Sequence, residues 1–359
     1  MTTITGTHET GKTKADVVFV TASATAKVRV FPLRVFEEFP ALTRIELSGV
    51  ELTSLTGMIT TCTNVHTVLL NKGKLTTIPE GIFRNCAKIT TLSFGENEIA
   101  EVHVNAFAGL PLLERIDLGD NKIVLLPATV FSANSLLNFV VIANNLIVTL
   151  EPQLIKTLTK LTHFFAYGNK ITELKPELFT NNHDLVDVSL FSNMLTKVNA
   201  DVFKNLNKLE SLELDSNRLE EVPSLEGLTV LKKLHLHGNN ITTLPAGAFK
   251  VQVNMVELTL ANNYLTEIKA ESFEKCDSLE SLNLKANKIE HIEKEFFDAV
   301  PKLKVLELES NVCVNKNYAA IDKAKIKEDE TLKDCYNAAS PLKLSIVLVF
   351  AYLLMNLLK

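Results

Sequence analysis

The chain contains 359 residues, with 37 Lys and Arg against 42 Asp and Glu, which gives a formal net charge of −5 at pH 7. This balance provides no basic excess to hold a nucleic-acid backbone, so we expect no nucleic-acid partner. Hydrophobic residues make up 46% of the chain and charged residues 22%, which excludes disorder for most of it. We therefore expect a folded chain with a large apolar core.

The first segment, residues 1–17, contains no apolar run of the kind found in a secretory signal peptide. We expect it to be disordered or to be the start of a gene model that lacks its signal peptide. Residues 18–41 are a degenerate copy of the unit that fills the middle of the chain, with Val28, Phe31 and Phe36 at its apolar positions.

Residues 42–311 repeat one unit about every 24 residues, of the form LxxLxLxxNxLxxLxxxxFxxLxx. Its copies begin at Leu42, Val65, Ile89, Leu113, Leu137, Leu161, Leu185, Leu209, Leu231, Met255, Leu279 and Leu303. Asn fills the ninth position at 97, 121, 145, 169, 193, 217, 239, 263, 287 and 311, and only Val50 and Gly73 depart from it. Self-similarity at such a period predicts a repeat solenoid, in which stacked units bury a continuous core.

The alternation within LxxLxL predicts a short strand whose fourth and sixth residues point inward and whose third and fifth point outward. Each ninth-position Asn is placed to satisfy backbone groups of a neighbouring turn, which predicts a hydrogen-bond ladder. A Phe occurs six residues before most following units, which predicts an aromatic spine on the opposite side of the coil. These Phe residues are Phe36, Phe83, Phe107, Phe131, Phe179, Phe203, Phe249, Phe273 and Phe297.

On these residues the chain resembles leucine-rich repeat proteins of the 24-residue class, and in its unit pattern and short cap it is similar to the cell-surface and secreted members from insects. The resemblance covers about residues 18–336. It implies an α/β repeat solenoid, a leucine-rich repeat horseshoe with a parallel sheet on its concave side and irregular or 3-10 structure on its convex side. It also implies a C-terminal cap at residues 312–336 that is closed by a disulfide between Cys313 and Cys335.

The other cysteines, Cys62, Cys86 and Cys276, each lie three residues before the next unit, where Leu stands in several turns. We expect each to be buried as a small apolar side chain. A disulfide between Cys62 and Cys86 is sterically possible, because they fall in adjacent turns.

The outward positions of the strands are mostly polar, but large apolar side chains replace them on three consecutive strands. The resulting patch, in which Asp187 is the acidic residue, comprises Phe139, Val141, His163, Phe165, Tyr167, Asp187 and Phe191. Patches of this kind usually mark protein contacts, so we expect ligand binding here. The alternative is that the rings pack only on one another.

A polar group continues this face with Glu213, Asp215, His235 and His237. Such residues could bind a divalent metal or change charge near pH 6, but a solvated row with cross-strand charge pairing is the simpler interpretation. We count these four residues with the ligand-binding face and expect no metal and no cofactor.

The end of the chain carries an apolar run at residues 344–359, preceded by small residues and a short spacer at residues 337–343. This pattern favours a glycosylphosphatidylinositol (GPI) anchor signal with Asn337 as the attachment site. A short transmembrane helix and an amphipathic or buried helix remain open. Asn240 begins the one acceptor sequence for N-glycosylation, Asn240-Ile241-Thr242.

The sequence contains none of the common nucleotide-binding, hydrolase or metalloprotease motifs, so we expect no enzyme. The leading hypothesis is a glycoprotein on the extracellular side of the plasma membrane that serves adhesion or innate immunity. It would bind a protein ligand or co-receptor by its concave face and the membrane by its C-terminus. The alternative is a cytosolic scaffold or regulatory subunit.

Overall fold

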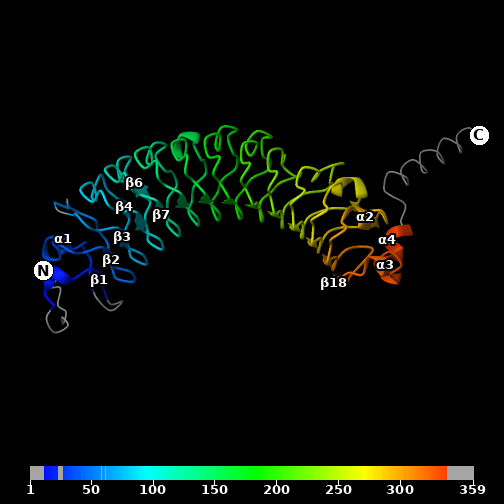
Figure 1. Ribbon diagram of the computed structural model, residues 1–359, viewed down its shortest axis with the longest axis horizontal. Helices are drawn as coiled ribbons and strands as arrows, with labels where there is room; N and C mark the ends of the chain where they lie inside the picture. The colour runs from blue at the N-terminus through cyan, green and yellow to red at the C-terminus, as the bar shows by residue number, and fades with distance from the viewer. Residues whose placement is uncertain (1–11, 23–26, 58, 61, 338–359) are drawn as a thin grey trace, which may run out of the picture. The chain divides into compact units, whose positions relative to one another are not determined.

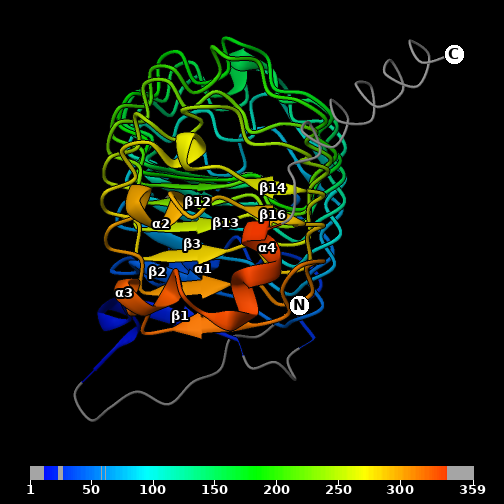
Figure 2. The ribbon, with the colours of Figure 1, turned by 90° about the vertical axis from the view of Figure 1, so that its right-hand side faces the viewer.

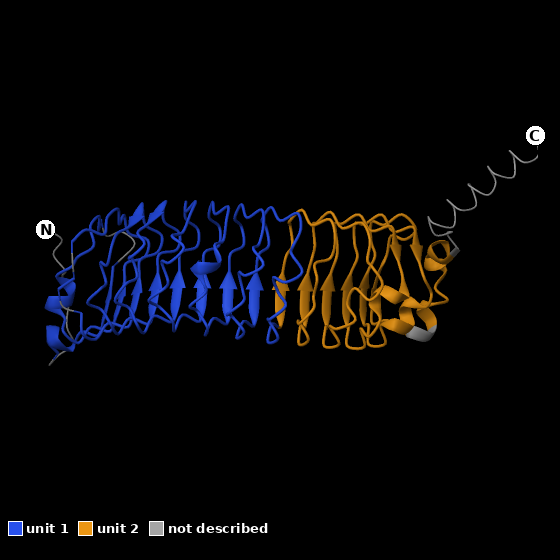
Figure 3. Ribbon diagram, turned by 90° about the horizontal axis from the view of Figure 1, so that it is seen from above, with its two compact units in different colours: residues 1–209 blue, residues 210–359 orange. Residues whose placement is uncertain are grey.

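The computed structural model describes residues 12–22, 27–57, 59–60 and 62–337. The chain divides into two compact units, Met1–Leu209 and Glu210–Lys359, which are coloured separately in Figure 3. Each unit is described by itself below.

Unit 1 is built on a parallel sheet whose strands lie side by side in chain order (Figure 1). These strands are β1 (Phe19–Thr21), β2 (Arg44–Glu46), β3 (Thr67–Leu69), β5 (Thr91–Ser93), β7 (Arg115–Asp117), β8 (Phe139–Val141), β9 (His163–Phe165) and β10 (Asp187–Ser189). A second, two-stranded sheet pairs β4 (Thr77–Ile78) with β6 (Glu101–Val102). Helical structure is limited to the short turns η1 (Lys14–Asp16), α1 (Val35–Glu38) and η2 (Pro152–Leu154).

Unit 2 continues the same pattern with β11 (Ser211–Glu213), β12 (Lys233–His235), β13 (Glu257–Thr259), β15 (Ser281–Asn283) and β17 (Val305–Glu307). The last strand, β18 (Asn317–Ala319), pairs antiparallel with β17, and β14 (Glu267–Ile268) pairs with β16 (His291–Ile292). Short helical turns follow the strands: η3 (Ala270–Phe273), α2 (Phe296–Ala299), α3 (Lys323–Ile326), η4 (Glu330–Leu332) and α4 (Lys333–Asn337). The predicted leucine-rich repeat solenoid, with its parallel sheet and little helix, is confirmed.

The three-residue strands form because their side chains alternate between the core and the surface. In β7, Ile116 is buried between Arg115, which is exposed, and Asp117, which is half-buried. The predicted aromatic spine is also present: Phe107 and Phe131 stack with ring centroids 5.7 Å apart in successive turns. Stacked aliphatic and aromatic layers therefore provide the core that a single turn could not bury alone.

The predicted asparagine ladder links successive turns from Asn97 onward. Asn145 Nδ2 donates to Leu118 O of the preceding turn at 2.9 Å, and Asn145 Oδ1 accepts from Ile123 N at 2.9 Å. A second ladder was not predicted: Asn134 and Asn182 each donate from Nδ2 to two carbonyls of the preceding turn at 2.8–3.1 Å. Both ladders satisfy backbone groups that the core removes from water.

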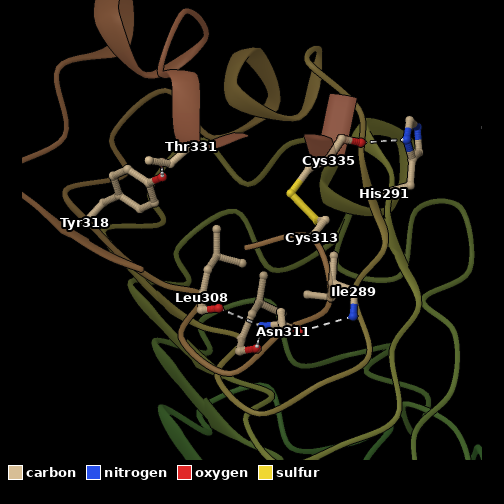
Figure 4. The surroundings of a disulfide bond; sticks show 9 residues. Ile289, His291, Leu308, Asn311, Cys313, Tyr318, Thr331 and Cys335 are labelled. Atoms are coloured by element: carbon tan, nitrogen blue, oxygen red, sulfur yellow. Dashed lines mark hydrogen bonds between the residues drawn. A yellow bond between two sulfur atoms is a disulfide. The ribbon is translucent and has the colours of Figure 1, made fainter. Parts of the chain in front are cut away.

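The cap disulfide between Cys313 and Cys335 is confirmed (Figure 4). It ties α4 to the turn that begins at Leu303, and His291 Nδ1 of the preceding turn lies 3.0 Å from Cys335 O. Figure 2 shows α3 and α4 lying across the end of unit 2 that faces the viewer. Leu332 and Cys335 of the cap are fully buried.

Cys62 and Cys86 are buried, as expected, but the interpretation of them as separate apolar side chains was wrong, because they form a disulfide. Adjacent turns bring their Cα atoms to 4.7 Å, which is the spacing of neighbouring strands and lies within the range that a disulfide bridges. Cys276 is buried as a free thiol, as expected, and burial raises its pKa to about 12.

Candidate functional site

The residues of the predicted apolar patch lie together on the outward face of the unit 1 sheet. The register places Phe139 of β8 beside His163 of β9, and His163 beside Asp187 of β10. Val140, between the two outward residues of β8, is fully buried. We name as the aromatic face cluster the apolar and aromatic residues Phe139, Val141, His163, Phe165, Tyr167 and Phe191.

The rings of the aromatic face cluster form two contacting groups, and each ring remains half-buried. Phe139 stacks on His163 with centroids 5.1 Å apart and meets Phe165 edge to face at 5.3 Å. Tyr167 and Phe191 stack nearly parallel, with centroids 4.4 Å apart and planes 7° from parallel. The rings therefore form a preassembled surface, less exposed than separate outward side chains would be. The rings thus pack on one another, as the alternative interpretation proposed, and they also present an accessible apolar face.

Charged groups border the cluster on β7 and the turn after it. The guanidinium carbon of Arg115 lies 3.8 Å from the ring centroid of Phe139. Asp117 accepts hydrogen bonds from Ser93 Oγ at 3.1 Å and from Gly119 N at 2.9 Å. This border thus holds a cation on an aromatic ring and a carboxylate fixed by hydrogen bonds.

The other four predicted residues, Glu213, Asp215, His235 and His237, belong to unit 2. His235 lies between two carboxylates, with Nδ1 3.7 Å from Asp215 Oδ2 and Nε2 3.3 Å from Glu257 Oε1. Asp215 also accepts from the backbone N–H of His237 at 2.6 Å. The group shows the cross-strand charge pairing of the simpler interpretation, and its four side chains are half-buried.

Burial raises the pKa of Asp215, and this effect exceeds the opposing ones of His235 and of the His237 N–H. In the part of the chain that the structure describes, no group of three or more His, Cys, Asp or Glu side chains could hold a metal ion. The geometry of this group gives no support to metal chemistry.

The structure describes the two predicted modification sites, Asn240 and Asn337, to different extents. Asn240 is exposed and follows the ladder residue Asn239, which is buried. Asn337 is the last residue of α4, and the spacer and apolar tail that follow it lie outside the described residues. None of the described helices has the length and apolarity to cross a bilayer.

Two features of unit 1 were not predicted. Arg115 was considered only as one more polar face residue, and the disulfide between Cys62 and Cys86 was not expected. The signal for the first was available, because Arg115 and Phe139 occupy the same position in successive units. The strand register alone, however, does not determine which neighbour a long side chain contacts.

Comparison with protein families decides the assignment. The family model described as leucine-rich repeat matches residues 63–123, 167–219, 229–289 and 253–313, which together make up more than half of the chain. The chain belongs to the leucine-rich repeat family. In this leucine-rich repeat protein, the matched segments include most of the strands of both units. No curated protein matches its sequence.

Solved structures show the same fold at low sequence identity. A complex of TLR13 with single-stranded RNA aligns with a TM-score of 0.75 and 22% identity over 83% of this chain and 44% of that one. The Toll–Spatzle complex of Drosophila gives 0.70 and 22% over 84% and 42%. A leucine-rich repeat protein of Leptospira interrogans gives 0.65 and 22% over 83% and 79%. The chain therefore spans less than half the length of the TLR13 and Toll–Spatzle chains that it matches.

Proposed function

We propose that this leucine-rich repeat protein is a non-catalytic recognition or adhesion protein of the cell surface, and that it binds a protein ligand through the aromatic face cluster. The observation that carries the proposal is the accessible, preassembled ring surface on β8 and β9 and the turns that follow β9 and β10. Aromatic side chains are favoured anchors in protein interfaces, because they bury much area at little cost in conformational entropy.

A protein ligand fits this surface better than RNA does. Among the structural neighbours, the Toll complex contains the protein Spatzle and the TLR13 complex contains single-stranded RNA. The net charge of this chain is −5, and Asp117 and Asp120 lie at positions on the outward face next to the cluster. Phosphate backbones require a basic surface, so these charges favour a protein.

An extracellular location is supported by the two disulfides, since such bonds persist mainly in oxidising compartments. They also make the cytosolic scaffold the weaker candidate. We propose that Asn337 carries a GPI anchor, that Asn240 carries a glycan, and that the protein serves adhesion or innate immunity. The polar group at Glu213, Asp215, His235 and His237 is proposed as a further part of the ligand-binding face.

The test of the binding proposal compares the full chain with its Phe165→Ala/Tyr167→Ala variant, by pull-down from native membranes and by thermal unfolding. We expect the variant to lose the partner while its Tm stays within a few degrees of the wild type, because the rings pack outside the core. Tyr264→Ala is the matched control, because Tyr264 is a 45% exposed aromatic residue of unit 2 and is not a member of the cluster. Equal loss of the partner in both variants, or loss of fold together with binding, would contradict the proposal.

The anchor is tested separately on intact cells that express the full chain. Treatment with a phosphatidylinositol-specific phospholipase should release the protein into the medium, because that enzyme cuts the lipid from a GPI anchor. Protein that stays with the cells after treatment, in a form that detergent alone releases, would instead indicate a membrane-spanning tail.

A further inference from the structure

Arg115 and Arg44 occupy the same place in their strands, yet their guanidinium groups make different contacts. Each Arg is the first residue of its strand, and an acidic residue on the same face lies two positions later. Arg44 forms an ion pair with Glu46, with Nη2 and Oε2 3.0 Å apart, and its guanidinium carbon lies 5.6 Å from the ring centroid of Phe19. The guanidinium of Arg115 lies closer to a ring, 3.8 Å from the centroid of Phe139, and among the described residues it has no ion pair.

The difference follows from the acidic partner. Asp117 is one methylene shorter than Glu46, and Ser93 Oγ and Gly119 N hold its carboxylate at 3.1 and 2.9 Å. Within the described residues, the Arg115 side chain forms no hydrogen bond and no ion pair, and it contacts the ring of Phe139. The guanidinium is therefore positioned by a ring, while its N–H groups are left to solvent.

A guanidinium that stacks on a ring keeps its N–H groups in its own plane, where the ring does not block them. Two of these groups can donate parallel hydrogen bonds to both oxygens of a carboxylate. Phe139 is itself held by its stack on His163 at 5.1 Å and by its contact with Phe165 at 5.3 Å. The support under Arg115 is thus part of the aromatic face cluster. Ordering the side chain before binding reduces the entropy that a partner must overcome.

We propose that Arg115 binds a side-chain carboxylate, from Asp or Glu, of a protein partner that also places an apolar side chain on the aromatic face cluster. This inference rests on the proposed function and names the chemistry of its ligand. Asp117 and Asp120 make the border of the cluster acidic, so the electrostatic potential there attracts a free anion only weakly. The partner's carboxylate is selected by direct paired hydrogen bonds to Arg115, with the apolar contact alongside.

The test uses an array of peptides with varied apolar cores, each present in three versions that differ only in a flanking Glu, Gln or Lys. The full chain should retain the Glu versions in preference to the Gln and Lys versions. Peptides retained this way should bind Arg115→Ala roughly tenfold more weakly, which is the usual effect of losing a hydrogen bond to a charged group. Arg115→Lys should recover only part of that loss, because an ammonium has no planar fork.

Arg44→Ala is the matched control, because it removes an Arg at the same strand position that is already paired. It should leave both affinity and charge preference unchanged. Binding that is lost in Phe165→Ala/Tyr167→Ala but shows no preference for Glu would overturn the role of Arg115 and leave the proposed function standing. A preference for Lys, or binding of a single-stranded RNA probe that competes with the peptides, would also overturn it. If no peptide of any version binds the wild type, the role proposed for Arg115 fails, and the pull-down with Phe165→Ala/Tyr167→Ala decides the proposed function separately.

Discussion

The asparagine ladder can be tested at Asn145, which is 4% exposed and lies in the middle of unit 1. Its Oδ1 is the acceptor for the amide of Ile123, and its Nδ2 donates to the carbonyls of Leu118, Ile142 and Ala143 at 2.9–3.2 Å. Each of those carbonyls accepts another hydrogen bond as well. The amide of Ile123 has no second acceptor among the described residues. Asn145→Ala therefore leaves one buried donor without a partner.

An unsatisfied buried donor costs about 1–3 kcal/mol, so with the weakened carbonyl contacts we expect Asn145→Ala to lower the free energy of unfolding by about 2–4 kcal/mol. Urea unfolding followed by circular dichroism measures this change. Amide hydrogen exchange at Ile123 measures it locally, and about 2 kcal/mol corresponds to a roughly 30-fold faster exchange.

The matched control is Asn105→Ala, because Asn105 is exposed in the same unit and its side chain donates only to Glu80, at 3.3 Å. This change should cost no more than about 0.5 kcal/mol. The reasoning about the ladder is refuted if the two variants unfold at the same urea concentration, or if exchange at Ile123 is unchanged in Asn145→Ala.

Further outcomes follow from the core, the cysteines and the glycan. Leu214→Ala should lower the free energy of unfolding by about 2–5 kcal/mol, because Leu214 is fully buried between stacked turns; a change under about 1 kcal/mol in urea unfolding would contradict this. A thiol reagent should label no cysteine in the native protein and only Cys276 after unfolding without reductant, because burial raises the pKa of that thiol to about 12; labelling of all cysteines would contradict the disulfides. Replacing both Cys62 and Cys86 by Ala should cost about 3 kcal/mol in the same unfolding assay, given their separation of 24 residues; an unchanged midpoint would count against the bond. Treatment with peptide N-glycosidase should lower the mass of protein from cells in one step, and Asn240→Gln should abolish that step; no step in the wild type would show that the site is unused.

The fold could be predicted from the sequence because the 24-residue pattern specifies both the short strands and the contacts between successive turns. The alternation that makes Ile116 inward and Arg115 outward is present in each unit, and the spacing of Asn145 from Asn169 equals one turn. The strand pattern and the Asn spacing of each unit therefore predict the same solenoid, so the prediction does not depend on any single unit.

The features that were missed depend on single turns. Asn134 and Asn182 form their ladder in only some units, so no period revealed them. Cys62 and Cys86 occupy a position filled by Leu elsewhere, and burial as apolar side chains was therefore the simpler interpretation. The contact of Arg115 with Phe139 depends on how side chains pack beside a shortened acidic neighbour, which periodicity does not determine.

The central claim, that a protein partner contacts the aromatic face cluster, is tested most directly by placing a photo-crosslinking phenylalanine analogue at single positions of the full chain on cells. The account predicts a crosslinked adduct of one defined mass when the analogue replaces Phe165 and none when it replaces Tyr264. An adduct at Tyr264 alone, or equal adducts at both positions, would contradict it.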